Sequence, residues 1–246
     1  MQKYSYSAKL GEHEIRIETG TLAKLAGGAI TIHSGDSVLL ATATAAKPRP
    51  GIDFFPLSVD YEERMYAAGR IPGSFFRREG RPSEHGILVC RLVDRPLRPL
   101  FPKGMRNEVQ VILTAFSRDP ECHLDILGII GASAAMTISD IPWEGPIGAV
   151  RVAFIDGAFV VNPTVSQMAA STLDLRMAGT ADAILMVEAG ADEIPEDIML
   201  EALRLGHEAM QPIIQIQNQM REELGKAKFE PYVAAFAPGA QDAVSN

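Results

Sequence analysis

The segment from Leu124 to Ser139 constrains the fold of this chain more than any other part of the sequence. Its residues, LDILGIIGASAAMTIS, are apolar or small on most sides of the helix that they predict. A helix without a clear polar face is stable in water only where other elements cover it. We therefore expect this helix to be buried on most sides, within a core that the rest of the chain must complete.

Segments of alternating polar and apolar residues predict β-strands on both sides of this helix. Before it, the predicted strands are Tyr4–Leu10, Glu14–Glu18, Ala29–His33, Val38–Thr44, Phe54–Glu62 and Asn107–Phe116. After it, they are Ile147–Ile155, Ala158–Val161, Leu173–Ala178 and Ala183–Glu188. Hairpin-like pairs of strands with few long helices favour the α+β class, with mixed or antiparallel sheets and packed helices. No phosphate-binding GxGxxG or GxxxxGK[ST] motif follows a strand.

Two more helices and one long loop complete the predicted elements. Ser83 is a candidate N-cap for a helix that continues to about Leu100, and Pro195 opens a helix that could extend to Gly225. Residues 66–82 contain three glycines and two prolines, which predicts an irregular loop. We expect one core over residues 1–225. The Ala- and Pro-rich residues 226–246 predict a linker or the truncated start of a further, helical domain.

Composition is that of an ordinary globular protein, with 47% hydrophobic and 22% charged residues. No stretch approaches the roughly 20 apolar residues of a membrane helix, and the first residues carry no visible export signal. The two cysteines, Cys90 and Cys122, form no spaced framework. The sequence therefore predicts a reduced, cytoplasmic protein without a membrane partner, in which both thiols are buried or incidental.

Basic residues are concentrated in one part of a chain whose net charge is −8. Between Arg64 and Arg106 there are ten basic residues, nine of them arginine, against three acidic ones, so this segment carries +7. Local potential matters more than net charge for the capture of a phosphate backbone, and arginine makes bidentate contacts to phosphate. The segment favours nucleic-acid binding, with a solvated basic surface as the alternative.

Two phenylalanines and two arginines follow one another on the predicted loop: Phe75, Phe76, Arg77 and Arg78. Aromatic rings offer a face on which unpaired bases stack, while guanidinium groups hold the backbone. This pattern is typical of a loop that grips a single strand. The alternative is a loop with buried phenylalanines and solvated arginines, and these residues alone do not decide between the two.

Three more arginines form a stripe on the helix that Ser83 begins. Arg91, Arg95 and Arg98 have the spacing i, i+4 and i+7, which places them on one side of the helix. Such a stripe could bind phosphate or the RNA backbone. Asp94 could instead pair with Arg91 and Arg98 within the helix, whereas Arg95 has no acidic residue at i±3 or i±4.

Other polar groups are weaker candidates for chemistry. Acidic residues surround the start of the last predicted helix, at Asp192, Glu193, Glu196 and Asp197. They could bind a hard cation, but the helix dipole also explains acids there. Cys122, His123 and Asp125 lack the spacing of a zinc site, and Ser133 lies mid-helix without a GxSxG turn, as a packing residue would. We predict no catalytic and no metal-binding residue in this chain.

Several long blocks of the sequence are specific enough to identify a family. The longest are YAAGRIPGSFFRREGRPSE at Tyr66–Glu84, RLVDRPLRPLFP at Arg91–Pro102 and LDLRMAGTADAILMVEAGA at Leu173–Ala191. DFFPLSVDYEER at Asp53–Arg64, GIIGASAAM at Gly128–Met136 and GPIGAVRV at Gly145–Val152 extend them. In this order, over roughly residues 3–225, the blocks resemble the first RNase PH-like core domain of bacterial-type polynucleotide phosphorylases.

The resemblance implies an RNase PH-like α+β fold, a ring-shaped homotrimer and the phosphate-dependent, processive 3′→5′ degradation of RNA to nucleoside diphosphates with Mg²⁺. The implied partners are single-stranded RNA, inorganic phosphate and two further copies of the chain, with proteins of an RNA-degradation complex as candidates. A full chain of this family has two such cores, a helical linker and two C-terminal RNA-binding domains. Its catalytic site and Mg²⁺ belong to the second core.

The resemblance also implies roles for individual residues. His123, Leu124 and Asp125 stand where the family's catalytic core has a run of serines, and Ser166 and Thr172 stand where it has metal-binding aspartates. Phe75, Phe76, Arg77 and Arg78 would form a constriction that grips incoming RNA, with Arg91, Arg95 and Arg98 nearby. Two alternatives to an RNA-guiding core are a self-sufficient phosphorolytic exoribonuclease similar to RNase PH and a purely structural, ring-forming module.

Overall fold

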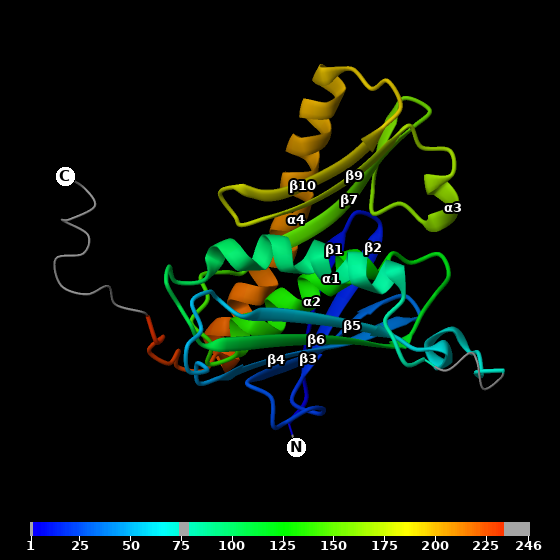
Figure 1. Ribbon diagram of the computed structural model, residues 1–246. Helices are drawn as coiled ribbons and strands as arrows, with labels where there is room; N and C mark the ends of the chain where they lie inside the picture. Colours follow the sequence, from blue (N-terminus) through cyan, green and yellow to red (C-terminus); the bar gives the residue numbers. More distant parts are fainter. Residues whose placement is uncertain (1, 74–78, 234–246) are drawn as a thin grey trace, which may run out of the picture.

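The computed structural model describes residues 2–73 and 79–233, in which two β-sheets are separated and flanked by helices (Figure 1). The larger sheet has the strand order β1-β2-β3-β4-β6-β5. Its strands are β1 (Tyr4–Leu10), β2 (His13–Thr19), β3 (Gly28–Ser34), β4 (Ser37–Ala46), β5 (Leu57–Glu63) and β6 (Glu108–Ser117). The smaller sheet has the order β10-β9-β7-β8. Its strands are β7 (Gly148–Ile155), β8 (Ala158–Val161), β9 (Leu173–Gly179) and β10 (Ile184–Ala191).

The helices fill the space between the sheets and cover one side of the molecule. They are η1 (Met65–Ala68), α1 (Glu84–Leu97), η3 (Arg98–Leu100), α2 (Leu124–Ile138), α3 (Val165–Met168) and α4 (Glu196–Leu224). In Figure 1, α1 and α2 lie between the two sheets, and α4 extends from the smaller sheet towards β1. Two sheets with packed helices confirm the predicted α+β class. None of the helices in the described ranges has the length and apolarity of a membrane span.

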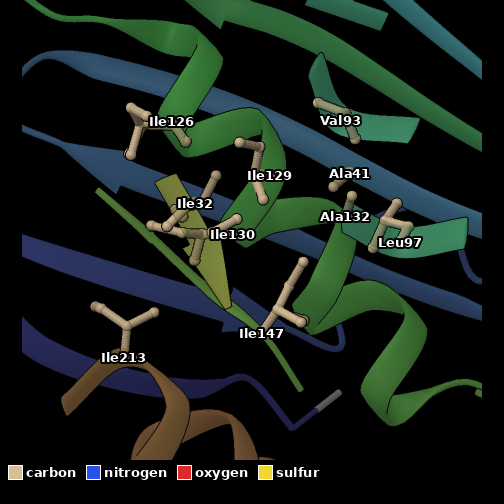
Figure 2. Close-up of a cluster of buried hydrophobic side chains, with 14 of the residues drawn as sticks. Ile32, Ala41, Val93, Leu97, Ile126, Ile129, Ile130, Ala132, Ile147 and Ile213 are labelled. Carbon is tan, nitrogen blue, oxygen red and sulfur yellow. The ribbon is translucent and has the colours of Figure 1, made fainter. Parts of the chain in front are cut away.

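Helix α2 is the centre of the core, as its sequence predicts. All of its residues are buried, and it contacts β3 and β4 of one sheet, β7 of the other, and both α1 and α4. Figure 2 shows Ile126, Ile129 and Ile130 of this helix among side chains that other elements contribute. The helix therefore joins the two sheets into one apolar core.

Glycine allows strand β3 to approach α2 closely. A Cβ atom on Gly28 would collide with the carbonyl oxygen of Ala135, which belongs to the backbone of α2. A Cβ atom on Gly131 of α2 would lie 3.2 Å from Ala41 Cβ and 3.3 Å from Ile32 Cγ2. The separation between helix and sheet thus depends on the absence of a side chain at these two positions.

Polar groups inside the core are linked by hydrogen bonds. Ser133 Oγ donates to Gln217 Oε1 at 2.6 Å and accepts from the backbone N of Ile147 at 2.9 Å. Gln217 in turn donates to the carbonyl of Ile147 at 2.9 Å. Ser133 is fully buried, so the structure confirms it as a packing residue. Trp143 is likewise buried, as its position between proline and glycine predicts, and donates to the carbonyl of Leu97 at 3.0 Å.

The helix ends agree closely with the sequence signals. Ser83 is the N-cap of α1, where its hydroxyl accepts from the backbone N of Gly86 at 3.0 Å. The α-helix ends at Leu97 and continues as the short 3₁₀-helix η3, because Pro96 and Pro99 cannot donate backbone hydrogen bonds. Helix α4 begins immediately after Pro195.

The larger sheet is mixed, which the predicted class allows, and one strand boundary differs from the prediction. Strand β5 begins at Leu57 rather than Phe54, and it pairs with β6 in parallel, unlike the antiparallel neighbours in the rest of that sheet. Parallel strands need a long crossover, which the segment with η1 and α1 provides. The short helices η1 and α3 were not predicted, since four residues carry too little periodicity to reveal a helix.

Residues 226–233 lie against the core. Lys228 Nζ donates to the carbonyls of Met136, Thr137 and Ser139 at 3.1, 3.1 and 2.6 Å, at the C-terminal end of α2. Further along, Val233 forms an antiparallel bridge with Met105. We call residues 226–233 the strap. Whether the domain ends near residue 225, as predicted, stays a prediction; residues 234–246 lie outside the described part of the chain.

Candidate functional site

A cleft of about 490 Å³ opens between α1, the start of α2 and the smaller sheet. Five arginines line it, against three acidic residues. The arginines are Arg91, Arg95, Arg118, Arg151 and Arg176, and the acids are Glu63, Asp125 and Glu188. With neutral histidines the charged lining residues sum to a net positive charge, which suits an anionic ligand.

The register of the smaller sheet places three of these charges in one row. Arg151 of β7 is the direct partner of Arg176 in β9, and Arg176 is the direct partner of Glu188 in β10. A β-bulge between Ile184 and Met186 sets the register in which Glu188 meets Arg176. Side chains of directly paired residues point to the same face of a sheet, and here that face is the wall of the cleft.

Asp174 is shared by the two arginines of this row. Arg151 holds its carboxylate with two hydrogen bonds of 2.7 Å, from Nε and a terminal nitrogen, and Arg176 adds one of 3.0 Å. Burial opposes ionisation of Asp174, but the hydrogen bonds and charges of both arginines hold its pKa below the ordinary 3.8. The carboxylate is therefore ionised at neutral pH and neutralises much of the charge of Arg151.

His123 is neutral in this environment. Burial lowers the pKa of its imidazole, and the charge of Arg151 lowers it further. An Arg151 terminal nitrogen lies 2.7 Å from His123 Nδ1, so Nδ1 accepts and the ring proton belongs on Nε2. Among the described residues, neither His123 Nε2 nor Arg176 Nε has a hydrogen-bond partner, although both atoms are buried. Arg176 Nε lies 3.6 Å from Asp125 Oδ2, too far for a hydrogen bond, so both donors could still donate to an acceptor-bearing ligand in the cleft.

The structure separates the three arginines that the sequence places on one stripe. Arg91 and Arg95 line the cleft, whereas Arg98 does not. Arg98 donates to both carboxylate oxygens of Asp94, at 2.9 and 2.6 Å, and to the carbonyls of Phe55 and Leu57. The intrahelical pair of Arg98 with Asp94 is thus formed, and Arg98 connects α1 to the start of β5.

Arg95 and Arg91 differ in their acidic partners. Arg95 has no acidic partner on its own helix, but it pairs with Glu188 of β10 at 2.8 Å across the cleft. Arg91 pairs with no carboxylate in the part of the chain that the structure describes, so the expected pair with Asp94 is absent there. Of the three arginines, Arg91 is therefore the one whose charge is not balanced by a neighbouring acid among these residues.

The predicted gripping residues Phe75, Phe76, Arg77 and Arg78 lie outside the described residues. The residue after them is anchored: Arg64 donates to the carbonyl of Glu79 at 3.0 Å, and the Glu79 carboxylate accepts from the backbone N of Met65. A second hollow, of about 470 Å³ and lined by Arg64, Arg70 and Arg118, shares Glu63 and Arg118 with the cleft. Glu79 thus contacts residues of a basic hollow that shares two lining residues with the cleft.

The other candidate groups show no metal-binding arrangement within residues 2–73 and 79–233, where no cluster of three or more His, Cys, Asp or Glu side chains could hold an ion. Glu196 and Asp197 lie in the first turn of α4, where the helix dipole favours them. Ser166 donates to Glu121 at 2.7 Å, and Thr172 to the carbonyl of Phe154 at 3.2 Å. Cys122 lines the cleft, and mainly through burial the pKa of its thiol is raised, so it stays protonated.

Sequence reasoning missed Arg118, Arg151, Arg176 and Glu188. Arg151 and Arg176 each stand alone as a basic residue in an otherwise largely apolar strand, GAVRVAFI and LDLRMAG. A single charge in a strand that is otherwise buried is costly unless it serves a site or a pair, and this signal could have found both. Glu188 gave the same signal, as the single charged residue of the strand ILMVEAGA.

Comparisons with known proteins agree with this architecture. Residues 11–142 match the model of the 3′ exoribonuclease family, domain 1 (RNase_PH), and residues 145–209 match domain 2 (RNase_PH_C). The chain is 53% identical to the polyribonucleotide nucleotidyltransferase of Heliobacterium modesticaldum over 240 residues, which are 97% of this chain and 34% of that protein. It is 56% identical to the protein of that name from Roseiflexus castenholzii, over 92% of this chain and 31% of that protein.

The chain thus spans about a third of the length of the curated relatives it matches. Among solved structures, rice Rrp46 superposes with a TM-score of 0.65 at 14% identity, covering 89% of this chain and 94% of that chain. At this identity the likeness concerns the fold alone.

Proposed function

Since the chain belongs to the 3′ exoribonuclease family of RNase PH-like proteins, we propose that it is the RNA-guiding first core of a polynucleotide phosphorylase. The whole enzyme would degrade single-stranded RNA processively from the 3′ end. In that reaction an oxygen of inorganic phosphate attacks the terminal phosphodiester, the 3′ oxygen of the preceding nucleotide leaves, and a nucleoside diphosphate is released. The proposal includes a homotrimeric ring in the cytoplasm that takes part in mRNA degradation, with proteins of an RNA-degradation complex as candidate partners.

The single observation that carries the RNA-guiding role is the cleft with five arginines. Arg91 and Arg95 line it from α1, and it shares Glu63 and Arg118 with the hollow lined by Arg64 and Arg70, where Arg64 donates to the carbonyl of Glu79. We propose that Phe75, Phe76, Arg77 and Arg78 hold the bases and backbone, and that Arg91 and Arg95 receive the phosphates that follow. Arg98 could join them only by releasing Asp94 and two backbone carbonyls.

The residues of the cleft do not fit the Mg²⁺ that the family implies. The acids of the cleft, Glu63, Asp125 and Glu188, each lie within ion-pair distance of at least one arginine, as does Asp174 beside it, so none of these carboxylates is available as an unpaired ligand. A hard cation needs several oxygen ligands without competing positive charge. We therefore propose that Mg²⁺ and the reacting groups belong to a second core and derive no catalytic step through residues of this chain.

Binding of a labelled single-stranded oligoribonucleotide tests the guiding role. Arg91→Ala and Arg95→Ala should weaken binding, and each should make the salt dependence of the affinity less steep, by about 0.7 in log–log slope for each phosphate that the variant no longer neutralises. Arg204→Ala is the matched control, because it also removes one arginine but lies on α4 outside the cleft. Equal affinities and slopes for all three variants and the unchanged chain would refute the role.

Incubation of the chain with labelled RNA, inorganic phosphate and Mg²⁺ separates this proposal from a self-sufficient enzyme. We expect no release of nucleoside diphosphate, because the proposal assigns Mg²⁺ and the reacting groups to a second core. Release of diphosphates that scales with the phosphate concentration would favour the self-sufficient phosphorolytic exoribonuclease. RNA affinity that none of the cleft or loop variants changes would favour the purely structural module.

A further inference from the structure

Glu188 joins two arginines that come from opposite walls of the cleft. Its Oε2 accepts from Arg95 of α1 at 2.8 Å, and its Oε1 accepts from Arg176 of β9 at 3.2 Å. Each carboxylate oxygen therefore receives a hydrogen bond from a different guanidinium group. Two oxygens of a phosphate group, held by two arginines, would make the same set of charge-assisted hydrogen bonds.

The other acids near the cleft cannot be exchanged for a ligand so easily. Asp174 receives three hydrogen bonds from Arg151 and Arg176, and the side chains of Asp125 and Glu63 are only 9% and 18% exposed. Glu188, in contrast, is 45% exposed and lies on β10, an edge strand of the smaller sheet. Exposed ion pairs contribute little to stability, so the Glu188 carboxylate can turn towards solvent at a small cost.

The consequence of that movement would fall mainly on Arg95. Glu188 is the carboxylate that pairs with Arg95 in the ranges that the structure describes, so its departure would leave the guanidinium group without an acid partner there. Arg176 would keep Asp174 and lose one of its hydrogen bonds. Together with the unpaired Arg91, the cleft would then present two arginines of α1 with free charge.

We infer that Glu188 is an internal competitor for phosphate, which occupies the Arg95–Arg176 position of the cleft until a phosphate group of the ligand displaces it. The inference rests on the proposed function, since it assigns a regulating contact to the same site. The contact weakens the binding of a single phosphate group, because that group must displace the carboxylate. A ligand with several phosphates is favoured, since its other phosphates hold it in the cleft while one of them replaces the carboxylate. The ligand chemistry is a phosphate group, from the RNA backbone or from free inorganic phosphate.

Glu188→Gln tests the inference because it keeps the shape of the side chain and removes its charge. We expect it to bind a short single-stranded oligoribonucleotide about two- to fivefold more tightly, the range that loss of one exposed ion pair allows. Glu201→Gln is the control: it also removes one carboxylate that pairs with an arginine, on α4 away from the cleft. Both variants have the same net charge, so a non-specific effect of charge would raise both affinities equally.

A variant of Arg95 tests whether the effect of Glu188→Gln on binding acts through Arg95. In an Arg95→Ala background, Glu188→Gln should have a clearly smaller effect, because the group that Glu188 neutralises is gone. Titration with inorganic phosphate in a calorimeter, done in parallel, distinguishes the two sources of the phosphate group. Tighter binding of RNA alone assigns the position to backbone phosphates, and tighter binding of inorganic phosphate alone assigns it to the free anion.

The outcomes separate this inference from the proposed function. Suppose that Arg95→Ala weakens RNA binding, while Glu188→Gln and Glu201→Gln have equal affinities for RNA and equal affinities for inorganic phosphate. The guiding role then stands, and the role of Glu188 as a competitor is refuted. If RNA binds to no variant but Glu188→Gln gains phosphate affinity over Glu201→Gln, the competitor stands and the guiding role is refuted. The glutamine of Glu188→Gln could keep a hydrogen bond to Arg95, so Glu188→Ala repeats the test without that bond. Thermal unfolding of every variant checks that each one is folded.

Discussion

Arg151 and Arg176 face each other as direct partners of strands β7 and β9, and one carboxylate, that of Asp174, holds both. Two like charges directly opposite each other destabilise a sheet unless an acid lies between them. Arg151 is also almost fully buried, with 9% of its side chain exposed, so its charge depends on this pairing. The arrangement makes Asp174 a structural requirement of the cleft wall.

Asp174→Asn should therefore lower the free energy of unfolding by about 2 kcal/mol at neutral pH, because it leaves the buried Arg151 with only the more distant Asp125, at 4.0 Å, as an acidic partner. The folded pKa of Asp174 lies below 3.8, so its stabilisation is complete well above that pH and is lost as the pH falls through the folded pKa. The difference between the unchanged chain and the variant should accordingly shrink in acid. Urea unfolding between neutral and acidic pH measures it, with the exposed Asp182→Asn as control; a difference that stays constant contradicts the prediction.

Arg98→Ala should lower the stability of the fold and have only a small effect on RNA affinity. The side chain ties α1 to the carbonyls of Phe55 and Leu57 and lies over the Phe55 ring, with 5.7 Å from its guanidinium carbon to the ring centre. We expect a loss of about 1 kcal/mol in the free energy of unfolding. RNA affinity should change less than in Arg91→Ala. A larger loss of affinity in Arg98→Ala than in Arg91→Ala would place Arg98 on the RNA path.

Variants of the predicted gripping residues can separate the contribution of the aromatic rings to RNA binding from that of the arginines. The double variant Phe75→Ala/Phe76→Ala should weaken RNA binding at least about fivefold while leaving the salt slope unchanged, because stacking on aromatic rings is not ionic. Arg77→Ala/Arg78→Ala should weaken binding and also reduce the slope. Filter binding over a range of salt concentrations measures both quantities. Unchanged affinity in both double variants means that the loop does not hold RNA.

Gly28→Ala should destabilise the core by about 2 kcal/mol, because its Cβ would press the backbone of β3 against that of α2 at Ala135. Gly190→Ala is the matched control, since a Cβ at that position would meet no atom within 4 Å. Thermal unfolding compares the two. If both variants unfold at the same temperature, the close approach of strand and helix is not a constraint.

Lys228→Met should loosen the strap and destabilise the end of α2 by about 2 kcal/mol, because the Lys228 ammonium group donates to three carbonyls that the variant leaves without this donor. Hydrogen exchange should become faster at Phe229, whose backbone N donates to the carbonyl of Asp140. Lys9→Met, in β1, controls for the loss of an exposed lysine. Unchanged exchange would show that the strap is held by other contacts.

Local patterns predicted the elements well where they recur over several residues. The apolar run of α2, the Ser83 cap and the alternation in β1, β2 and β6 are each visible in consecutive residues, and the structure has each within a few residues of its predicted position. The parallel pairing of β5 with β6 was not predictable in this way. It depends on how α1 crosses over, which is a property of the packed chain and not of either strand.

The charged pairs of the cleft were even less predictable from local sequence patterns. The sequence separates Arg95 from Glu188 by 93 positions, and no local pattern connects them. The helical spacing of Arg91, Arg95 and Arg98 correctly placed all three on the exposed side of α1, yet only the fold decides that two of them enter the cleft and the third contacts β5. Charge partners across elements are therefore what the sequence could not supply.

The bulge between Ile184 and Met186 has a consequence for how this surface tolerates change. Successive residues of a strand point to opposite faces, so a regular ladder without the bulge, in which Leu185 pairs with Ala178, would place Val187 opposite Arg176 and turn Glu188 to the other face. A change in the length of this hairpin that shifts the register by one residue could thus remove the acidic member of the row although Glu188 itself is retained. For this wall of the cleft, the length of a hairpin is as decisive as the identity of its side chains.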